Sequence, residues 1–203
     1  ISKYEVPEEL AKKVRASILF AGPLVARFGK AILPPPGGDT IGRRRIDTHI
    51  VALQELGARI SLENTLTFSA TKLVGVPVFL DEASVTGTEN AIMAASLAEG
   101  TTIIMNAACE PHVQDLCRML IQMGAEIDGV GSNRLIIKGA ESLNGTDFAI
   151  SADYMELGSF IGLAVVTGGD LRIDGVNADD LPPLKVGFSK LGVTWDMKGS
   201  TLR

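Results

Sequence analysis

The chain of 203 residues has few cysteines and no long uninterrupted apolar run. Its two cysteines, Cys109 and Cys117, are too few for a disulfide framework, so the sequence predicts a pair of buried, reduced thiols and no metal site. The longest apolar stretch, residues 16–26, is interrupted by Gly22 and Pro23. A membrane-spanning helix needs roughly 20 apolar residues, so the sequence predicts a soluble protein that does not cross a membrane.

Charge excludes further classes of protein. With 19 Lys and Arg against 24 Asp and Glu, the net charge is −5, so no nucleic-acid partner is expected. No charged segment followed by an apolar one opens the chain, so nothing indicates export. The chain begins at Ile1 without an initiator methionine, and we expect it to be a segment of a longer polypeptide.

An internal repeat of about 67 residues is the most informative feature of the sequence. A glycine-containing motif recurs at intervals of 67 and 68 residues, as Leu56-Gly57-Ala58, Met123-Gly124-Ala125 and Leu191-Gly192-Val193. Each copy is expected to contain an apolar helix ended by a glycine, a short strand, an amphipathic helix and two further strands. With a leading strand, expected at Val76–Leu80 and Asp147–Ile150, the unit is β-α-β-α-β-β.

The first helix of each copy is apolar on nearly every face. These helices are expected at Arg15–Phe28, Thr88–Glu99 and Tyr154–Thr167, with Gly29, Gly100 and Gly169 after them. A helix without a polar stripe is buried all round. The sequence therefore predicts an α/β fold with these helices inside and with sheets and amphipathic helices outside.

One copy of the repeat carries an insertion. From Gly29 to Gly57 the chain runs 28 residues, against 24 and 23 in the other copies, and the extra residues fall within residues 34–45. An insertion in a repeat maps to a loop, and loops carry function on a rigid scaffold. Asp39 sits among its glycines, and three arginines follow before a predicted helix. Arginines at a helix N-terminus suit a phosphate or carboxylate, although a solvated hairpin is the alternative.

Other polar residues have two interpretations each. Arg15 stands at the start of an apolar helix, where a cation opposes the helix dipole; either an anion binds beside it or its side chain snorkels at the helix end. Residues 84–90 either cap the second apolar helix or cradle a diphosphate or sugar. Asp47 either accepts from a uracil N3–H or caps its own helix. His49 and His112 are interpreted as packing or surface residues.

Seven segments carry a resemblance to a known family: residues 15–18 (RASI), 22–29 (GPLVARFG), 36–44 (PGGDTIGRR), 47–49 (DTH), 58–60 (ARI), 84–90 (SVTGTEN) and 98–102 (AEGTT). They resemble, in order over nearly the whole chain, the UDP-N-acetylglucosamine enolpyruvyl transferases. The resemblance implies two lobes, each an inside-out α/β barrel of three β-α-β-α-β-β units. Residues 1–150 would form two units of the first lobe, with a catalytic loop at 34–45, and residues 151–203 the first unit of the second.

The resemblance also implies a reaction. An enolpyruvyl group moves from phosphoenolpyruvate to the 3-hydroxyl of UDP-N-acetylglucosamine with release of phosphate, the first committed step of peptidoglycan synthesis. It takes place in the bacterial cytoplasm and needs no metal or organic cofactor. Asp39 stands where most members have a reactive cysteine, and would be the general acid that protonates C3 of phosphoenolpyruvate.

The substrate-binding residues implied by the resemblance fall into three groups. Arg44 would bind phosphoenolpyruvate and the nucleotide phosphates, with Arg15 in the same pocket, and the stretch from Arg44 to Thr48 would hold the uridine. The third group, residues 84–86, would form the turn that holds the diphosphate. In chain order the implied residues are Arg15, Arg44, Arg45, Ile46, Asp47, Thr48, Ser84, Val85 and Thr86.

The sequence departs from the family pattern at several points. Asp39 removes the thiolate that fosfomycin alkylates, which predicts resistance. Arg45 replaces a usual proline and Glu82 stands near a usual lysine. The N-terminal Lys-Asn pair, the aspartate of the second lobe and a late arginine have no counterpart, so the chain alone is expected to be inactive and to need the remaining segments of its polypeptide. A shikimate 3-phosphate enolpyruvyl transferase and a non-catalytic fragment that binds a nucleotide sugar are the alternatives.

Overall fold

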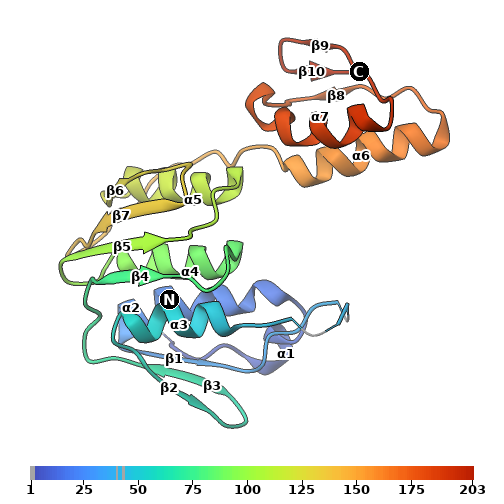
Figure 1. Cartoon of the computed structure of the whole chain (residues 1–203). Helices are drawn as coiled ribbons and strands as arrows, with labels where there is room; N and C mark the ends of the chain where they lie inside the picture. Colours follow the sequence, from blue (N-terminus) through green and yellow to red (C-terminus); the bar gives the residue numbers. More distant parts are fainter. Residues whose placement is uncertain (1–2, 40, 43) are drawn as a thin grey trace. The chain divides into compact units, whose positions relative to one another are not determined.

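The computed structural model describes residues 3–39, 41–42 and 44–203, which fall into two compact units (Figure 1). Unit 1 is Ile1–Asp147 and unit 2 is Phe148–Arg203. No helix among the described residues has both the length and the apolar character needed to cross a membrane.

Unit 1 contains two copies of the repeat. The first comprises α1 (Glu8–Ala11), the 3-10 helix η1 (Arg15–Phe20), α2 (Ala21–Phe28), β1 (Lys30–Leu33), α3 (Asp47–Glu55), β2 (Arg59–Leu62) and β3 (Leu66–Ser69). The second comprises β4 (Pro77–Phe79), α4 (Val85–Ala95), β5 (Thr101–Met105), α5 (Pro111–Gln122), β6 (Glu126–Asp128) and β7 (Arg134–Lys138).

Unit 2 contains the third copy. Its elements are α6 (Tyr154–Thr167), β8 (Ile173–Asp174), the 3-10 helix η2 (Ala178–Asp180), α7 (Leu181–Lys190), β9 (Met197–Lys198) and β10 (Thr201–Leu202). The strand predicted at Asp147–Ile150 was wrong: these residues form no strand, because in the described structure β8 pairs only with β10.

The three sheets confirm the repeat. Their strand orders are β1-β3-β2, β4-β5-β7-β6 and β8-β10-β9, so in each copy the last strand lies between the other two antiparallel strands. The second copy adds β4, which is parallel to β5. A parallel bridge between Glu5 and Ile32 occupies the corresponding place in the first copy.

The repeated glycine motif closes each amphipathic helix in the same way. Gly57, Gly124 and Gly192 have φ values of 99°, 107° and 77°, in the left-handed region that glycine adopts without strain. The residue after each glycine donates its N–H back to the helix: Ala58 to Leu53, Ala125 to Leu120 and Val193 to Phe188. This is the Schellman arrangement, which explains why the motif recurs at a fixed interval.

The apolar helices differ from the prediction in their ends. The first is a 3-10 helix up to Phe20, because Pro23 has no N–H and α2 begins just before it. The second begins at Val85 and ends at Ala95, where i to i−3 bonds tighten its last turn, so Gly100 does not cap it. The third ends as predicted, but its left-handed cap is Gly168 rather than Gly169.

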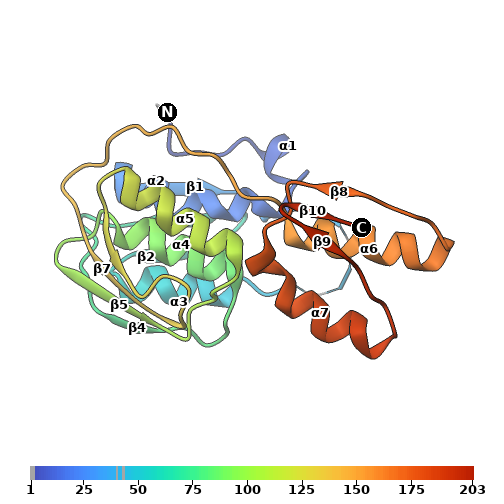
Figure 2. The ribbon, with the colours of Figure 1, turned by 90° about the horizontal axis from the view of Figure 1, so that it is seen from above.

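Helix α4 is the centre of unit 1. It packs against α2, α3 and α5, and Figures 1 and 2 show it between these helices with the sheets outside them. The core of unit 1 is built from both buried helices and the inner faces of both sheets, as predicted for α2 and α4.

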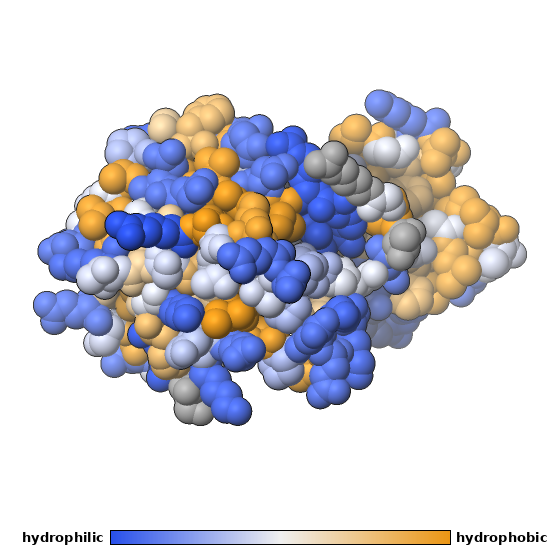
Figure 3. All heavy atoms as spheres, turned by 90° about the horizontal axis from the view of Figure 1, so that it is seen from below, coloured by the Kyte–Doolittle hydropathy of each residue, from blue (hydrophilic) through white to orange (hydrophobic). Residues whose placement is uncertain are grey.

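Helix α6 was expected to be buried all round, and this was wrong. Only Leu157 and Ile161 are buried, whereas Val166 is 81% exposed. Besides α6, unit 2 has only the short η2, α7 and three two-residue strands with which to cover it. Apolar surface on unit 2 is visible in Figure 3. The pair of buried thiols was also half wrong: Cys117 is buried, but Cys109 lies exposed in the segment before α5, and both are free.

Candidate substrate-binding site

The N-terminal ends of α3 and α4 lie side by side. A Cβ atom on Gly87, in the first turn of α4, would fall 2.8 Å from Cγ2 of Thr48 in α3. The Thr48 hydroxyl donates a 2.8 Å hydrogen bond to Oδ1 of Asp81, in the segment that leads into α4. The first N–H groups of a helix lack acceptors within it and carry the positive end of its dipole. Two such ends together favour a bound anion.

The segment that carries Asp39 is fixed against the start of the chain by two glycines. The Gly37 N–H donates to Ala11 O at 3.1 Å, and a Cβ on Gly37 would fall 1.7 Å from the Lys12 carbonyl oxygen. Gly38 has a φ of 92°, and a Cβ on it would lie 3.1 Å from the Arg15 nitrogen. Asp39 itself is exposed and follows directly. Two residues of the loop predicted at 34–45, Thr40 and Arg43, lie outside the described residues.

Arg15 and Arg44 form a pair of close cations. Arg15 Nη2 donates a 2.6 Å hydrogen bond to the Arg45 carbonyl, which joins η1 to the segment before α3. Burial, and then the nearby Arg44 guanidinium, lower the pKa of Arg15. No carboxylate in the described part of the chain makes an ion pair with Arg15 or Arg44, whereas Arg45 has two. Unpaired guanidinium groups that repel each other favour an anion between them.

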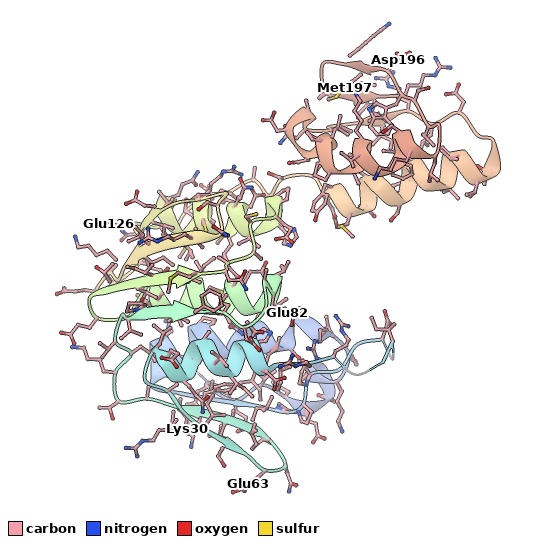
Figure 4. The ribbon with its side chains drawn as sticks, in the orientation of Figure 1. Lys30, Glu63, Glu82, Glu126, Asp196 and Met197 are labelled. Atoms are coloured by element: carbon pink, nitrogen blue, oxygen red, sulfur yellow. The ribbon has the colours of Figure 1, made fainter. Side chains whose placement is uncertain are left out.

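Arg45 has a different role from its neighbour. Its Nε donates to Asp47 Oδ2 at 2.5 Å and its Nη2 to Asp81 Oδ2 at 3.3 Å. The hydrogen bond and charge of Asp47, with smaller effects of Asp81 and Glu82, raise the pKa of Arg45. Figure 4 marks Glu82 on the segment between β4 and α4. The charge of Arg45 is therefore compensated within the chain.

The expectation that Asp47 caps its own helix was wrong. The N-cap of α3 is Ile46, without a side-chain cap bond, and Asp47 is the first helical residue. Its carboxylate turns to Arg45 because that guanidinium offers a charged donor. Ile46 is half-buried and packs against the core.

The start of α4 combines a cap with open N–H groups. Ser84 is the N-cap, and its Oγ accepts from Gly87 N at 3.2 Å, as one of the two interpretations of this segment predicts. Thr88 Oγ1 is buried and accepts from Ala108 N. The N–H groups of Val85 and Thr86 have no acceptor inside the helix, so this turn can still bind an anion through its backbone.

His49 is a site residue that the sequence did not identify. It is 1% exposed and lies between Asn90 and Thr86, with ring-to-partner distances of 2.7 Å and 3.2 Å. Burial, and then the charge of Arg15, lower its pKa from 6.5 to about 4, so the ring is neutral near pH 7. The sequence signal that could have pointed to His49 was Asn90, because a polar side chain within an apolar helix needs a buried hydrogen-bond partner.

The structure thus brings most of the predicted residues to one place. Arg15, Arg45, Asp47, Thr48 and the first turn of α4 are linked by direct contacts. Arg44 lies close enough for its charge to lower the pKa of Arg15. Asp39 directly follows Gly38, which packs against Arg15. The described residues contain no cluster of acidic, histidine or cysteine side chains that could hold a metal ion.

Comparison with known proteins identifies the family. The family model described as EPSP synthase (3-phosphoshikimate 1-carboxyvinyltransferase) matches residues 1–200. The chain belongs to the EPSP synthase family. A solved structure of the enolpyruvyl transferase NikO from Streptomyces tendae aligns with 99% of this chain and 49% of its own, with a TM-score of 0.81 and 22% identity. EPSP synthase from Acinetobacter baumannii aligns with a TM-score of 0.62 and 18% identity, over 91% of this chain and 44% of its own. The predicted enolpyruvyl transferase fold is confirmed.

Two curated relatives with high identity to this chain share a name. The chain is 66% identical to the UDP-N-acetylglucosamine 1-carboxyvinyltransferase of Treponema denticola, over 98% of this chain and 46% of the relative. The protein of that name from Treponema pallidum is 64% identical, over 94% of this chain and 45% of the relative. The chain spans about half the length of the curated relatives it matches.

Proposed function

We propose that this chain is part of an enzyme that transfers the enolpyruvyl group of phosphoenolpyruvate to the 3-hydroxyl of UDP-N-acetylglucosamine and releases phosphate. This is the first committed step of peptidoglycan synthesis. The observation that carries the proposal is the convergence of two unpaired arginines, Arg15 and Arg44, with the N-terminal ends of α3 and α4. The high identity to transferases of that name supports the choice of acceptor.

The anionic parts of both substrates have matching groups. Arg15 and Arg44 would hold the phosphate of phosphoenolpyruvate and the adjacent nucleotide phosphates. The open N–H groups at the start of α4, after the Ser84 cap, would hold the diphosphate. Asp47 would accept the N3–H of uracil with the oxygen that Arg45 leaves unoccupied, because Arg45 bonds to only one of its two oxygens.

Asp39 would supply the proton. As a carboxylic acid it would protonate C3 of phosphoenolpyruvate, and the 3-hydroxyl of the sugar would attack the resulting cationic C2. Phosphate then leaves with the proton that the attacking hydroxyl gives up, and C3 returns a proton to the Asp39 carboxylate, which restores the double bond in the product. In the structure Asp39 is exposed, so this role requires closure of residues 34–45 over the substrates, which would bury the acid and favour its protonated form.

We further propose that residues 1–150 contribute two repeat units to one lobe and that residues 151–203 begin a second lobe. The exposed apolar residues of α6 fit this arrangement, since further units of the second lobe would cover them. The chain by itself is then incomplete, and we expect it to bind UDP-N-acetylglucosamine more weakly than the full-length protein and to turn nothing over.

Phosphate release by the full-length protein tests the proposal. Release that depends on UDP-N-acetylglucosamine and falls at least about a thousandfold in Asp39→Ala would support both the substrate and the acid. Asp174→Ala removes an acid of unit 2 outside the site and is the matched control. Release of phosphate only with shikimate 3-phosphate would show that this compound, and not UDP-N-acetylglucosamine, is the acceptor. Binding of UDP-N-acetylglucosamine without any release of phosphate would indicate a non-catalytic binding protein.

A further inference from the structure

A buried chain of hydrogen bonds connects the core of unit 1 to the start of α4. The Asn90 side chain, on α4, contacts Gly22 and Ile18 as well as the ring of His49. The other ring nitrogen of His49, Nε2, lies 3.2 Å from Oγ1 of Thr86. Asn90 is fully buried and Thr86 is half-buried, so the chain leads from the core toward the surface.

The contacts of Asn90 fix the orientation of its amide. Gly22 N is a backbone N–H and can only donate, so the Asn90 atom 2.9 Å from it is the acceptor Oδ1. The Asn90 Nδ2 donates to the Ile18 carbonyl at 2.9 Å, which can only accept. The same Nδ2 lies 2.7 Å from His49 Nδ1 and therefore donates to it.

The tautomer of His49 follows from that donor. A neutral imidazole carries one N–H, and the nitrogen that accepts a hydrogen bond is the one without it. Since Nδ1 accepts from Asn90, the proton is on Nε2 and is donated to Thr86 Oγ1. His49 is the only residue in the described part of the chain that is hydrogen-bonded to this hydroxyl. The proton of the Thr86 hydroxyl is thus left for an acceptor outside the chain.

We propose that His49 is a positioning residue, which acts through Thr86 so that this hydroxyl donates its proton to an oxygen of the diphosphate bound at the start of α4. With the opposite tautomer, Thr86 would donate to His49 and would present only lone pairs, which repel phosphate oxygens. This inference rests on the proposed function, because it presupposes that UDP-N-acetylglucosamine binds here.

The tautomer itself can be measured. Nitrogen–proton correlation spectra of the full-length protein, labelled with 15N-histidine, distinguish a ring protonated at Nε2 from one protonated at Nδ1. His49→Gln removes and so identifies the His49 signals, and His112 provides a second, exposed ring within this chain. We expect the Nε2–H tautomer at pH 7. The Nδ1–H tautomer would overturn the proposal.

Variants test whether the effect passes through Thr86. Glutamine at 49 offers an amide oxygen and an N–H2 group in place of Nδ1 and Nε2–H, so His49→Gln should keep the affinity for UDP-N-acetylglucosamine within about twofold. His49→Met has neither group and Thr86→Val has no hydroxyl, and each should weaken binding about tenfold or more. The double variant, with His49→Met and Thr86→Val together, should bind no more weakly than Thr86→Val alone, because both substitutions remove the same hydrogen bond to the diphosphate.

Uridine, which lacks the diphosphate, separates positioning from general damage to the site. Its affinity should be unchanged in His49→Met and Thr86→Val, whereas a purely structural defect would weaken both ligands. Unchanged binding of UDP-N-acetylglucosamine by His49→Met, or additive losses in the double variant, would overturn this inference alone. If the wild-type protein fails to bind UDP-N-acetylglucosamine, the proposed function fails and the inference fails with it.

Discussion

The guanidinium of Arg45 holds the carboxylate of Asp47, with Nε 2.5 Å from Oδ2. Asp47 is the first residue of α3, and the N-terminus of this helix has no side-chain cap bond. Asp81 accepts from both Arg45 and Thr48, so the pairing is tied to the start of α3. Glu82, which the resemblance marks with Arg45 as a departure from the family pattern, lies close enough to stabilise the charge of Arg45.

Removal of Arg45 should therefore impair uridine recognition. In Arg45→Ala the Asp47 carboxylate loses the guanidinium with which it pairs and can adopt other rotamers, so we expect the KM for UDP-N-acetylglucosamine to rise about threefold to tenfold. The KM for phosphoenolpyruvate should change little. Steady-state kinetics of the full-length protein measure both constants.

Arg172 supplies a matched control for that experiment. It also pairs with an aspartate two residues along, Asp174, at 3.0 Å, but on the surface of unit 2. Arg172→Ala should leave both KM values unchanged. Equal effects of the two variants would show that the orientation of Asp47 by Arg45 has no part in binding.

The loop that carries Asp39 should tolerate no side chain at Gly37. A Cβ there would overlap the Lys12 carbonyl oxygen, so the backbone must shift. We expect Gly37→Ala to lower the free energy of unfolding by about 1–3 kcal/mol and to reduce turnover strongly, because Asp39 moves with the loop. Gly145→Ala meets open space and is the control. Urea unfolding together with phosphate release would measure both effects, and wild-type turnover in Gly37→Ala would contradict the proposed role of the loop.

The sequence predicted the fold well because the signals for it are local. The left-handed glycines after the amphipathic helices and the fully apolar helices are properties of short segments, and both recur in all three copies. The exposure of α6 and the missing strand at Asp147–Ile150 depend instead on which neighbours are present to cover or pair with them. No local pattern records those neighbours.

The site was predicted less completely for the same reason. The family resemblance pointed to the segments that the structure brings together, but the bonds within the site join residues far apart in sequence. Capping of its own helix was one interpretation of Asp47, but its carboxylate pairs with Arg45, which also bonds to Asp81, 36 residues from it. The sequence alone also gave no pairing for His49, whose partner Asn90 is 41 residues away.

Fosfomycin should fail to inactivate the full-length enzyme irreversibly. The drug alkylates a thiolate, and Asp39 presents a carboxyl group, which is a weaker nucleophile toward it. Asp39→Cys should convert the enzyme to a form that loses activity permanently on incubation with the drug. Phosphate release after removal of free drug, with mass spectrometry of the modified peptide, provides the measurement. Cys109 is exposed and serves as an internal control for non-specific alkylation. Irreversible loss of wild-type activity with an adduct on Asp39 would contradict the prediction.

The buried His49 should make stability depend on pH. Its pKa falls from 6.5 in an exposed ring to about 4 in the folded protein, through burial and then the charge of Arg15. Between these two values the unfolded chain binds more protons than the folded one, so the free energy of unfolding rises with pH in that window. The contribution of His49 is fully present above pH 6.5 and is lost as the pH falls toward 4. It amounts to about 3 kcal/mol.

His49→Gln isolates this contribution, because glutamine does not titrate. Urea unfolding at pH 7 and pH 4.5 should show a smaller loss of stability in His49→Gln than in the wild type, by about 2–3 kcal/mol. His112→Gln removes the exposed histidine of this chain and is the matched control. Identical pH dependence in His49→Gln and the wild type would mean that the folded protein protonates His49 as readily as the unfolded chain does. That result would be incompatible with a neutral ring held between Asn90 and Thr86.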